Sequence, residues 1–356
     1  MQLYIRATGN ISPQPTFGHP GLWEQPLAHT GNRLNCVEPD YKTLIDPKLI
    51  RRMSRIIKMG VAAAMECLQE AGVTVPDAIV TGTAYGCLED TGTFLTKMID
   101  QQESLLAPTA FIQSTHNTVG AQIALQLKCH GYNNVFVHRS FSFESALLDA
   151  MLLLQEGEAN NVLVGGLDEI TNASHTILSR FGIYKKELRS NLDLYDAAGK
   201  GTIAGEGAAF FLLTRQASGN DYAKLAALTT FYKPSGMEEI SGRIRGFLQD
   251  QSITTADIDL LITGRNGDIK SDDSYDKIIT TCFTGIPAIN YKHLCGEYPT
   301  SAAFALWLAS QLVMAGQVPA DGSTFKEINS ARPLKRILIY HQTQYTHHSL
   351  LLITAC

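Results

Sequence analysis

The chain has 356 residues, of which 45% are hydrophobic, so it can bury a large core, while a formal net charge of −5 with scattered Lys and Arg argues against a nucleic-acid partner. No apolar run reaches the roughly 18 residues of a membrane-spanning helix, and no secretory signal opens the chain. The seven cysteines stand singly, without a C-x-x-C pair, which predicts neither a metal site nor a disulfide framework and favours a cytoplasmic protein with reduced thiols.

The first half of the chain alternates apolar strands with helices. Gly72 and Gly157 end two helices whose apolar residues recur at helical spacing. The polar residues 107–120 are predicted to be irregular. The expected strands are one within residues 1–50, then 78–83, 135–138, 161–164 and 207–214, and the expected helices are 51–71, 91–102, 121–127, 143–154 and 174–181.

The second half repeats this pattern. In both halves a helix precedes a strand that ends in glycine, and a later strand turns sharply into an apolar helix. The repeat predicts a duplicated α/β unit, divided into residues 1–215 and 216–356, with mainly parallel strands. The expected strands are 225–231, 258–263, 288–292, 336–340 and 349–354, and the expected helices are 240–249, 275–283 and 301–314.

One stretch, residues 135–169, has the order strand, tight turn, helix, strand, which is the frame of a nucleophile elbow. Such a turn places one side chain at a helix N-terminus, where backbone amides and the helix dipole favour a developing anion. Ser140 lies at that point, and no obvious base stands beside it in the sequence.

This stretch resembles the active-site segment of the β-ketoacyl synthases, the condensing enzymes of the thiolase superfamily, through residues 156–159 (EGEA) and 162–166 (VLVGG). The resemblance covers nearly the whole chain, and it implies the thiolase-like fold, an α/β/α/β/α arrangement of five layers with duplicated halves. Further matching segments are 4–13, 52–55, 82–86, 114–117 and 201–208.

The resemblance also implies where catalytic residues should stand. The synthases use a cysteine nucleophile and two histidines, and the matching positions here hold Ser140, Gly264 and Glu297, while the family's Lys292 is retained. Serine is a poor replacement because its hydroxyl stays protonated at neutral pH. Thr343, a candidate substrate-binding residue, lies in the segment that matches the family's glycine-rich gating loop, and this segment contains no glycine. Four changes on a matching frame predict that the condensing reaction has been abandoned.

Each candidate residue also has a structural interpretation. Ser140 and Ser142 are either nucleophiles or, as we favour, caps whose hydroxyls bind amides of the following helix. His138 is a base for either serine or a core or interface residue, and we favour the second. Lys292 and Glu297 form an acid/base pair or, as we favour, a buried ion pair. We expect no metal and no cofactor.

The sequence therefore favours a ketosynthase-like protein that resembles the chain-length factors, the non-condensing partners of active synthases. That resemblance implies a heterodimer with an active β-ketoacyl synthase, an acyl carrier protein as a further partner, and polyketide- or polyene-type lipid synthesis. It also implies that Phe111 and Thr115 line the neighbour's acyl pocket. Two alternatives remain, a serine-dependent acyltransferase or thioesterase and a homodimeric acyl-binding scaffold.

Overall fold

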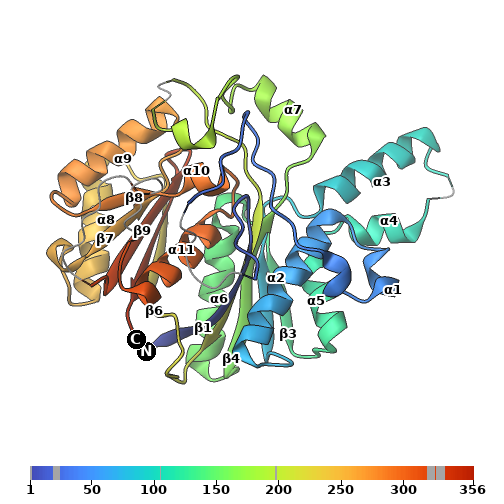
Figure 1. The fold of residues 1–356 in the computed structure, drawn as a ribbon, viewed down its shortest axis with the longest axis horizontal. Helices are drawn as coiled ribbons and strands as arrows, with labels where there is room; N and C mark the ends of the chain where they lie inside the picture. The colour runs from blue at the N-terminus through green and yellow to red at the C-terminus, as the bar shows by residue number, and fades with distance from the viewer. Residues whose placement is uncertain (1, 19–24, 105, 197–198, 319–324, 326–332) are drawn as a thin grey trace.

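The computed structural model describes residues 2–18, 25–104, 106–196, 199–318, 325 and 333–356 (Figure 1). Its strands are β1 (Leu3–Ile11), β2 (Ala78–Gly82), β3 (Tyr132–Phe136), β4 (Asn161–Asp168), β5 (Gly207–Thr214), β6 (Ala223–Tyr232), β7 (Leu260–Thr263), β8 (Ala288–Asn290), β9 (Arg336–Thr343) and β10 (His347–Thr354). They form one sheet in the order β3-β2-β4-β5-β1-β6-β10-β9-β7-β8.

The helices alternate with these strands. They are α1 (Pro47–Ile50), α2 (Arg55–Ala71), α3 (Leu88–Asp100), α4 (Pro108–Gln113), α5 (Thr118–Leu127), α6 (Ser142–Glu156), α7 (Asn172–Arg180), α8 (Met237–Asp250), α9 (Ile269–Cys282), α10 (Lys292–Cys295) and α11 (Ala302–Ala315). No helix in the described part of the chain is both long and apolar enough to cross a membrane.

The sheet consists of two halves with the same strand order. Read outward from the centre, β1, β5, β4, β2 and β3 correspond to β6, β10, β9, β7 and β8, and short antiparallel pairing of β1 with β6 joins the halves. The expectation of mainly parallel strands is wrong for the middle of the sheet. From β4 to β9 every neighbouring pair is antiparallel, and only the outer β2, β3, β7 and β8 pair in parallel. The tight β9–β10 hairpin explains one such pair, because a short turn permits only antiparallel neighbours.

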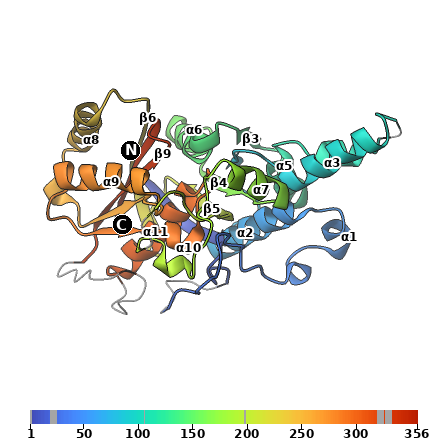
Figure 2. The same cartoon turned by 90° about the horizontal axis from the view of Figure 1, so that it is seen from above.

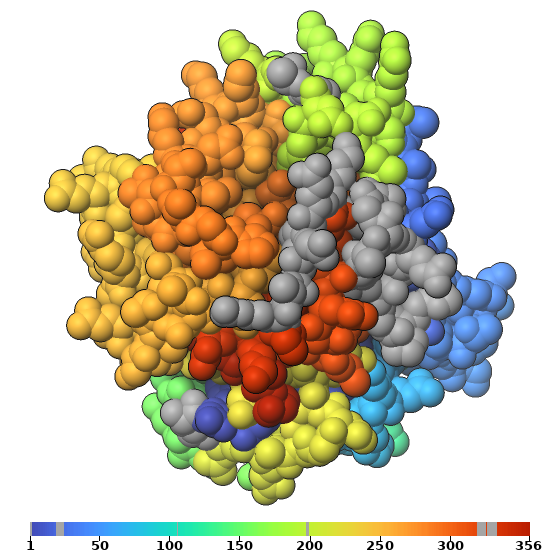
Figure 3. All heavy atoms as spheres, turned by 60° about the vertical axis from the view of Figure 1, so that its left-hand side comes forward, coloured from blue at the N-terminus to red at the C-terminus, as the bar shows by residue number. Residues whose placement is uncertain are grey.

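Three apolar clusters separate the five layers, as the resemblance implied. The central cluster joins α6 and α11 to both halves of the sheet. On the outer faces, α2 covers the first half, and α8 and α9 cover the second (Figure 1). Figure 3 shows the side of the molecule on which α8 and α9 lie. Helix α11 is buried continuously from Ala302 to Val313. A helix that is apolar all round belongs in such a core, so the fold class is confirmed.

The first half carries a projection that the sequence did not predict. Residues 108–113 form α4 where an irregular segment was expected, and α4 packs beside α3 at the end of the molecule (Figures 1 and 2). Neither α3 nor α4 has a buried residue. We place the division between the two halves in the connection from β5 to β6, at residues 215 and 216.

Candidate functional site

The predicted elbow joins β3 to α6 through a short turn. Arg139 has φ +47°, in the left-handed region that non-glycine residues seldom adopt. The Ser142 hydroxyl accepts a hydrogen bond from the His138 amide at 2.9 Å and donates one to the Arg139 carbonyl at 2.7 Å. No side chain caps the first turn of α6. The predicted capping role of Ser140 and Ser142 is therefore wrong, and Ser142 instead fixes the turn before the helix.

Ser140 is buried, but its hydroxyl makes no hydrogen bond to any residue that the structure describes. His138 is exposed, so it is not a core residue, and its assignment to an interface stays a prediction. The next residue, Phe141, packs edge-on against His347 of β10, with ring centroids 4.8 Å apart. This contact connects the elbow of the first half to the second half of the sheet.

Gly264 follows β7 in a space that other side chains fill. A Cβ atom on Gly264 would lie 2.5 Å from the Tyr275 hydroxyl and 2.6 Å from Nδ1 of His341. The His341 imidazole is held on both sides, with Nδ1 3.0 Å from the Tyr291 hydroxyl and Nε2 3.2 Å from Oγ1 of Thr343. Position 264 therefore has no room for an imidazole or any other side chain.

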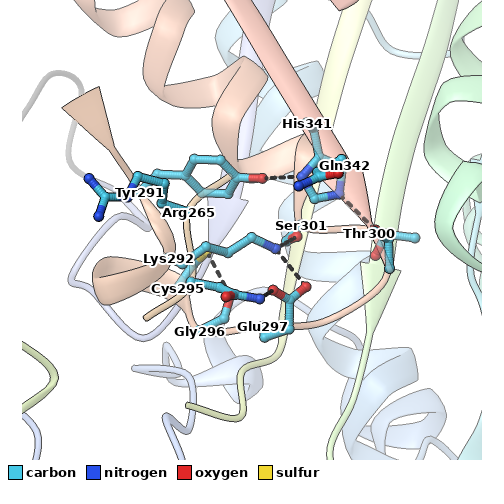
Figure 4. Close-up of polar contacts among 12 residues, drawn as sticks. Arg265, Tyr291, Lys292, Cys295, Gly296, Glu297, Thr300, Ser301, His341 and Gln342 are labelled. Carbon is cyan, nitrogen blue, oxygen red and sulfur yellow. Dashed lines mark hydrogen bonds and ion pairs between the residues drawn. The ribbon is translucent and has the colours of Figure 1, made fainter. Parts of the chain in front are cut away.

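His341 is neutral near physiological pH. Its side chain is buried, and the desolvation of the imidazolium, together with the neighbouring positive charge of Lys292, lowers the pKa of His341 well below its ordinary value of 6.5. Figure 4 shows its ring beside Tyr291 and the Lys292 side chain just beyond.

Lys292 and Glu297 form the ion pair that the sequence predicted, although only Lys292 is fully buried and the Glu297 side chain is 20% exposed. Lys292 is 0% exposed and its Nζ lies 2.8 Å from Oε1 of Glu297 (Figure 4). Nζ also donates to the Ser301 hydroxyl, and the second carboxylate oxygen of Glu297 accepts a hydrogen bond from Asn266 at 2.9 Å. Both charged groups are engaged, so neither acts as a free acid or base.

Glu144 is a buried carboxyl group in the first turn of α6. It lies one turn beyond Ser140 on α6, is 0% exposed, and accepts a hydrogen bond from Ser349 of β10 at 2.9 Å. Its other oxygen, Oε2, accepts no hydrogen bond from any residue that the structure describes. Burial raises the pKa of Glu144 to about 7, although Ser349 and the charge of Lys292 act in the opposite direction. Its position in the apolar stripe with Phe143 and Leu147 could have revealed this burial.

We expect Glu144 to make stability depend on pH. The folded chain binds the Glu144 proton more tightly than the unfolded chain, so the stabilisation is complete below about pH 4.5 and is lost as the pH rises to about 7. The free energy of unfolding should fall by up to about 1.4 kcal/mol per pH unit in that window. Urea unfolding at pH 5 and pH 8 should show that Glu144→Gln gains stability relative to the wild type at the higher pH.

The control is Glu156→Gln, at the exposed end of the same helix. It should leave the pH dependence of unfolding as it is in the wild type. Parallel stability curves for Glu144→Gln and the wild type across this range would contradict the role of Glu144.

The predicted site residues fall into two groups. Gly264, Lys292, Glu297 and Thr343 lie in one network around β7, β9 and α10, and Ser140 adjoins it through Phe141 and β10. Thr343 begins a tight turn in which the Thr346 amide donates to the Thr343 carbonyl at 3.2 Å. A tight turn therefore occupies the segment that the resemblance aligns with the family's gating loop.

Phe111 and Thr115 lie apart from this network. Phe111 is 57% exposed on α4 and packs against Phe94 of α3, with ring centroids 5.6 Å apart. The Thr115 hydroxyl bonds locally, to the Ile112 carbonyl at 2.9 Å and to Asn117 at 2.8 Å. Phe111 thus lies on the projecting α4, and Thr115 lies in the connection from α4 to α5.

The sequence is similar to those of known proteins. A family model described as the N-terminal domain of β-ketoacyl synthase matches residues 32–218. The 3-oxoacyl-[acyl-carrier-protein] synthase 2 of Synechocystis sp. is 25% identical over 188 residues, which are 49% of this chain and 44% of that protein. The protein of the same name from Staphylococcus aureus is 22% identical over 203 residues, or 52% of this chain and 48% of that one. The matches thus span about half the length of these relatives.

Solved structures resemble the chain over its whole length. The ishigamide ketosynthase/chain length factor has a TM-score of 0.79 at 16% identity, covering 100% of this chain and 99% of that one. A β-ketoacyl synthase from Burkholderia phymatum has the same TM-score and coverage at 13% identity. A ketosynthase in complex with its chain length factor, from Xenorhabdus doucetiae, has a TM-score of 0.74 at 14% identity, covering 100% and 98%. At these identities the likeness establishes the fold.

Proposed function

The chain belongs to the β-ketoacyl synthase family, and on that premise we propose that it is a non-condensing, chain-length-factor-like subunit. It pairs with an active β-ketoacyl synthase and helps to shape the acyl chain that the synthase extends on an acyl carrier protein. The products are of the polyketide or polyene lipid type.

The filled space at Gly264 carries the proposal. The resemblance aligns this residue with a catalytic histidine, and the Tyr275 hydroxyl and the His341 ring lie where its Cβ would be. Two further aligned positions hold Ser140, whose hydroxyl lacks a base among the described residues, and Glu297, which is bound to Lys292. A condensing site needs a nucleophile and donors to the developing oxyanion, and none of the three positions supplies its part.

An exposed apolar surface supports a protein partner. Exposed apolar side chains lie on β3, which is the edge strand at one end of the sheet, on α5 and α6, which contact β3, and on the projecting α3 and α4. An edge strand offers unpaired backbone groups to another chain, and exposed apolar side chains gathered in one region are typical of interaction sites. The exposed large apolar residues of this region are Leu95, Ile99, Phe111, Ile112, Leu125, Tyr132, Val137 and Leu152.

The named neighbours suggest what the partner is. Two of the structures named above are a ketosynthase/chain length factor and a ketosynthase in complex with its chain length factor. A further similar structure is a type II PKS acyl-carrier protein in complex with its ketosynthase. We assign Phe111 and Thr115 to the surface that meets the partner's acyl pocket, because Phe111 lies on the projecting α4 and Thr115 in the connection from α4 to α5. The volume of the Phe111 side chain would then limit the length of the product.

The pairing is tested by co-expression with an active synthase of the same family and its carrier protein. We expect the two chains to co-purify and to make ketoacyl products together, whereas this chain alone makes none that mass spectrometry detects. Tyr132→Asp, at the start of β3, should prevent co-purification, because it places a charge in the apolar contact. The matched control is Ile269→Asp, an exposed apolar residue at the far end of the sheet on α9, which should co-purify as the wild type does.

Ketoacyl synthesis by this chain alone, lost in Ser140→Ala, would contradict the proposal. Stoichiometric acylation of Ser140 would instead favour a serine-dependent acyltransferase or thioesterase. A stable homodimer with bound fatty acid that excludes every candidate synthase would favour the acyl-binding scaffold.

A further inference from the structure

A cavity lies where the two halves of the sheet separate, away from the Gly264 network. β1 pairs with β6 only from Leu3 to Ile5, so the later part of β1 has an open edge on this side. The cavity of about 530 Å³ is bordered by this edge, by α2 and by α11. Its volume falls in the range of small-molecule sites.

Two carboxylates on successive turns of α2 face this edge. Oε2 of Glu66 accepts a hydrogen bond from the Asn10 amide at 3.1 Å, and Oε2 of Glu70 accepts one from the Thr8 amide at 2.8 Å. Their other oxygens accept from the Gly18 amide and the Tyr222 hydroxyl respectively. These bonds satisfy the open strand, and each carboxylate oxygen keeps a second lone pair.

Neither carboxylate has a cationic partner in the part of the chain that the structure describes. Among the described residues, Glu66 and Glu70 form no ion pair, and no Lys, Arg or His borders the cavity. Burial, with a smaller contribution from the charge of Glu70, raises the pKa of Glu66 to about 7. Two like charges at this spacing repel each other, so a positively charged group would relieve an unfavourable arrangement.

The side chain of Asn10 supplies an independent indication of a ligand. Asn10 borders the cavity and is 98% buried, and its amide nitrogen, Nδ2, makes no hydrogen bond to any described residue. A buried donor without an acceptor costs free energy. The aromatic rings of Tyr222 and Trp307, also on the wall, offer surface to an alkyl chain and to a cation.

We propose that this cavity binds a small organic ammonium ion that also carries an oxygen acceptor, an amino alcohol in chemical class. The ammonium group donates to Glu66 and Glu70, the oxygen accepts from Nδ2 of Asn10, and the connecting carbons lie against Trp307. The site is separate from the Gly264 network, and the inference does not depend on the proposed function.

The test measures binding of four probes of similar length to the full chain by isothermal titration calorimetry. They are 4-amino-1-butanol, 1-butylamine, 1,4-diaminobutane and 1,4-butanediol. We expect 4-amino-1-butanol to bind at least tenfold more tightly than 1-butylamine, which lacks the oxygen, and than 1,4-butanediol, which lacks the charge. Asn10→Ala should abolish the preference over 1-butylamine, because it removes the donor that distinguishes the two.

Glu70→Gln should weaken the binding of 4-amino-1-butanol at least tenfold, while Glu238→Gln, on the exposed surface of α8, should leave it unchanged. Gln69→Lys provides a second variant that keeps both carboxylates and places a tethered ammonium group at the cavity wall. It should compete with the probe and weaken binding without lowering the melting temperature.

Three results would overturn the proposal. The first is no binding of any amine at millimolar concentration, which would leave the carboxylates only a structural role. The second is equal binding of the diol and the amino alcohol. The third is displacement of the probe by calcium or magnesium at lower concentration, which would indicate an inorganic cation instead. Tighter binding of 1,4-diaminobutane than of 4-amino-1-butanol would also reject the oxygen contact.

Discussion

Replacing Glu297 by histidine, the residue that the resemblance expects there, should lower the free energy of unfolding by about 3–5 kcal/mol. The reason is that Lys292 is 0% exposed and that, among the described residues, only Glu297 forms an ion pair with its Nζ, at 2.8 Å. The substitution leaves a buried ammonium group without compensation, because the Ser301 hydroxyl carries no charge. Urea unfolding followed by circular dichroism measures the loss.

The loss of stability should disappear when both Lys292 and Glu297 are replaced by apolar residues. Lys292→Met combined with Glu297→Leu should be close to the wild type in stability, since a buried ion pair replaced by apolar side chains is often neutral. Asp273→Asn, which breaks the exposed pair with Lys277 on α9, is the control and should change stability by less than the experimental error. A Glu297→His variant as stable as this control would show that Lys292 does not depend on Glu297.

The sequence predicted most of the fold because its signals are local. The apolar run of α11 and the glycines that follow α2 and α6 mark elements whose boundaries depend on neighbouring residues. The direction of the central strands was predicted wrongly, because pairing between β4 and β5 or between β1 and β5 joins segments far apart in the chain. Residues 108–113 were taken as irregular because α4 has no buried stripe to give it a helical period.

The candidate site was predictable only in part, for the same reason. The resemblance singled out Lys292 and Glu297, which lie within one short segment and form an ion pair. The hydroxyl of Ser142 was assigned to the wrong amide, because the choice between the His138 amide and those of α6 depends on the left-handed backbone at Arg139. The contacts of Glu144 with β10 and of Gly264 with His341 depend on tertiary packing, which no spacing encodes.

The filled space at Gly264 leads to the second large effect. Gly264→His should prevent stable folding or lower the free energy of unfolding by more than the ~1–3 kcal/mol that is typical of one overpacked core site. Even the Cβ atom of alanine would lie 2.6 Å from the His341 ring and 2.5 Å from the Tyr275 hydroxyl. Tyr275 cannot retreat easily, because its hydroxyl donates to the Gln342 carbonyl and accepts from the Gln342 amide.

The comparison with a second glycine separates crowding from a general effect of adding a side chain. Gly246→Ala in α8, where no atom lies within 4 Å of the added Cβ, should raise the free energy of unfolding by about 0.5–1 kcal/mol, as alanine does in a helix. Combining Gly264→Ala with His341→Ala should recover part of the stability lost in Gly264→Ala alone, because the first contact disappears with the imidazole. If Gly264→His folds as stably as the wild type, the space beside β7 is free, and the physical basis for a non-condensing site is lost. If it does not, a histidine at this position requires changes in Tyr275 and His341 as well.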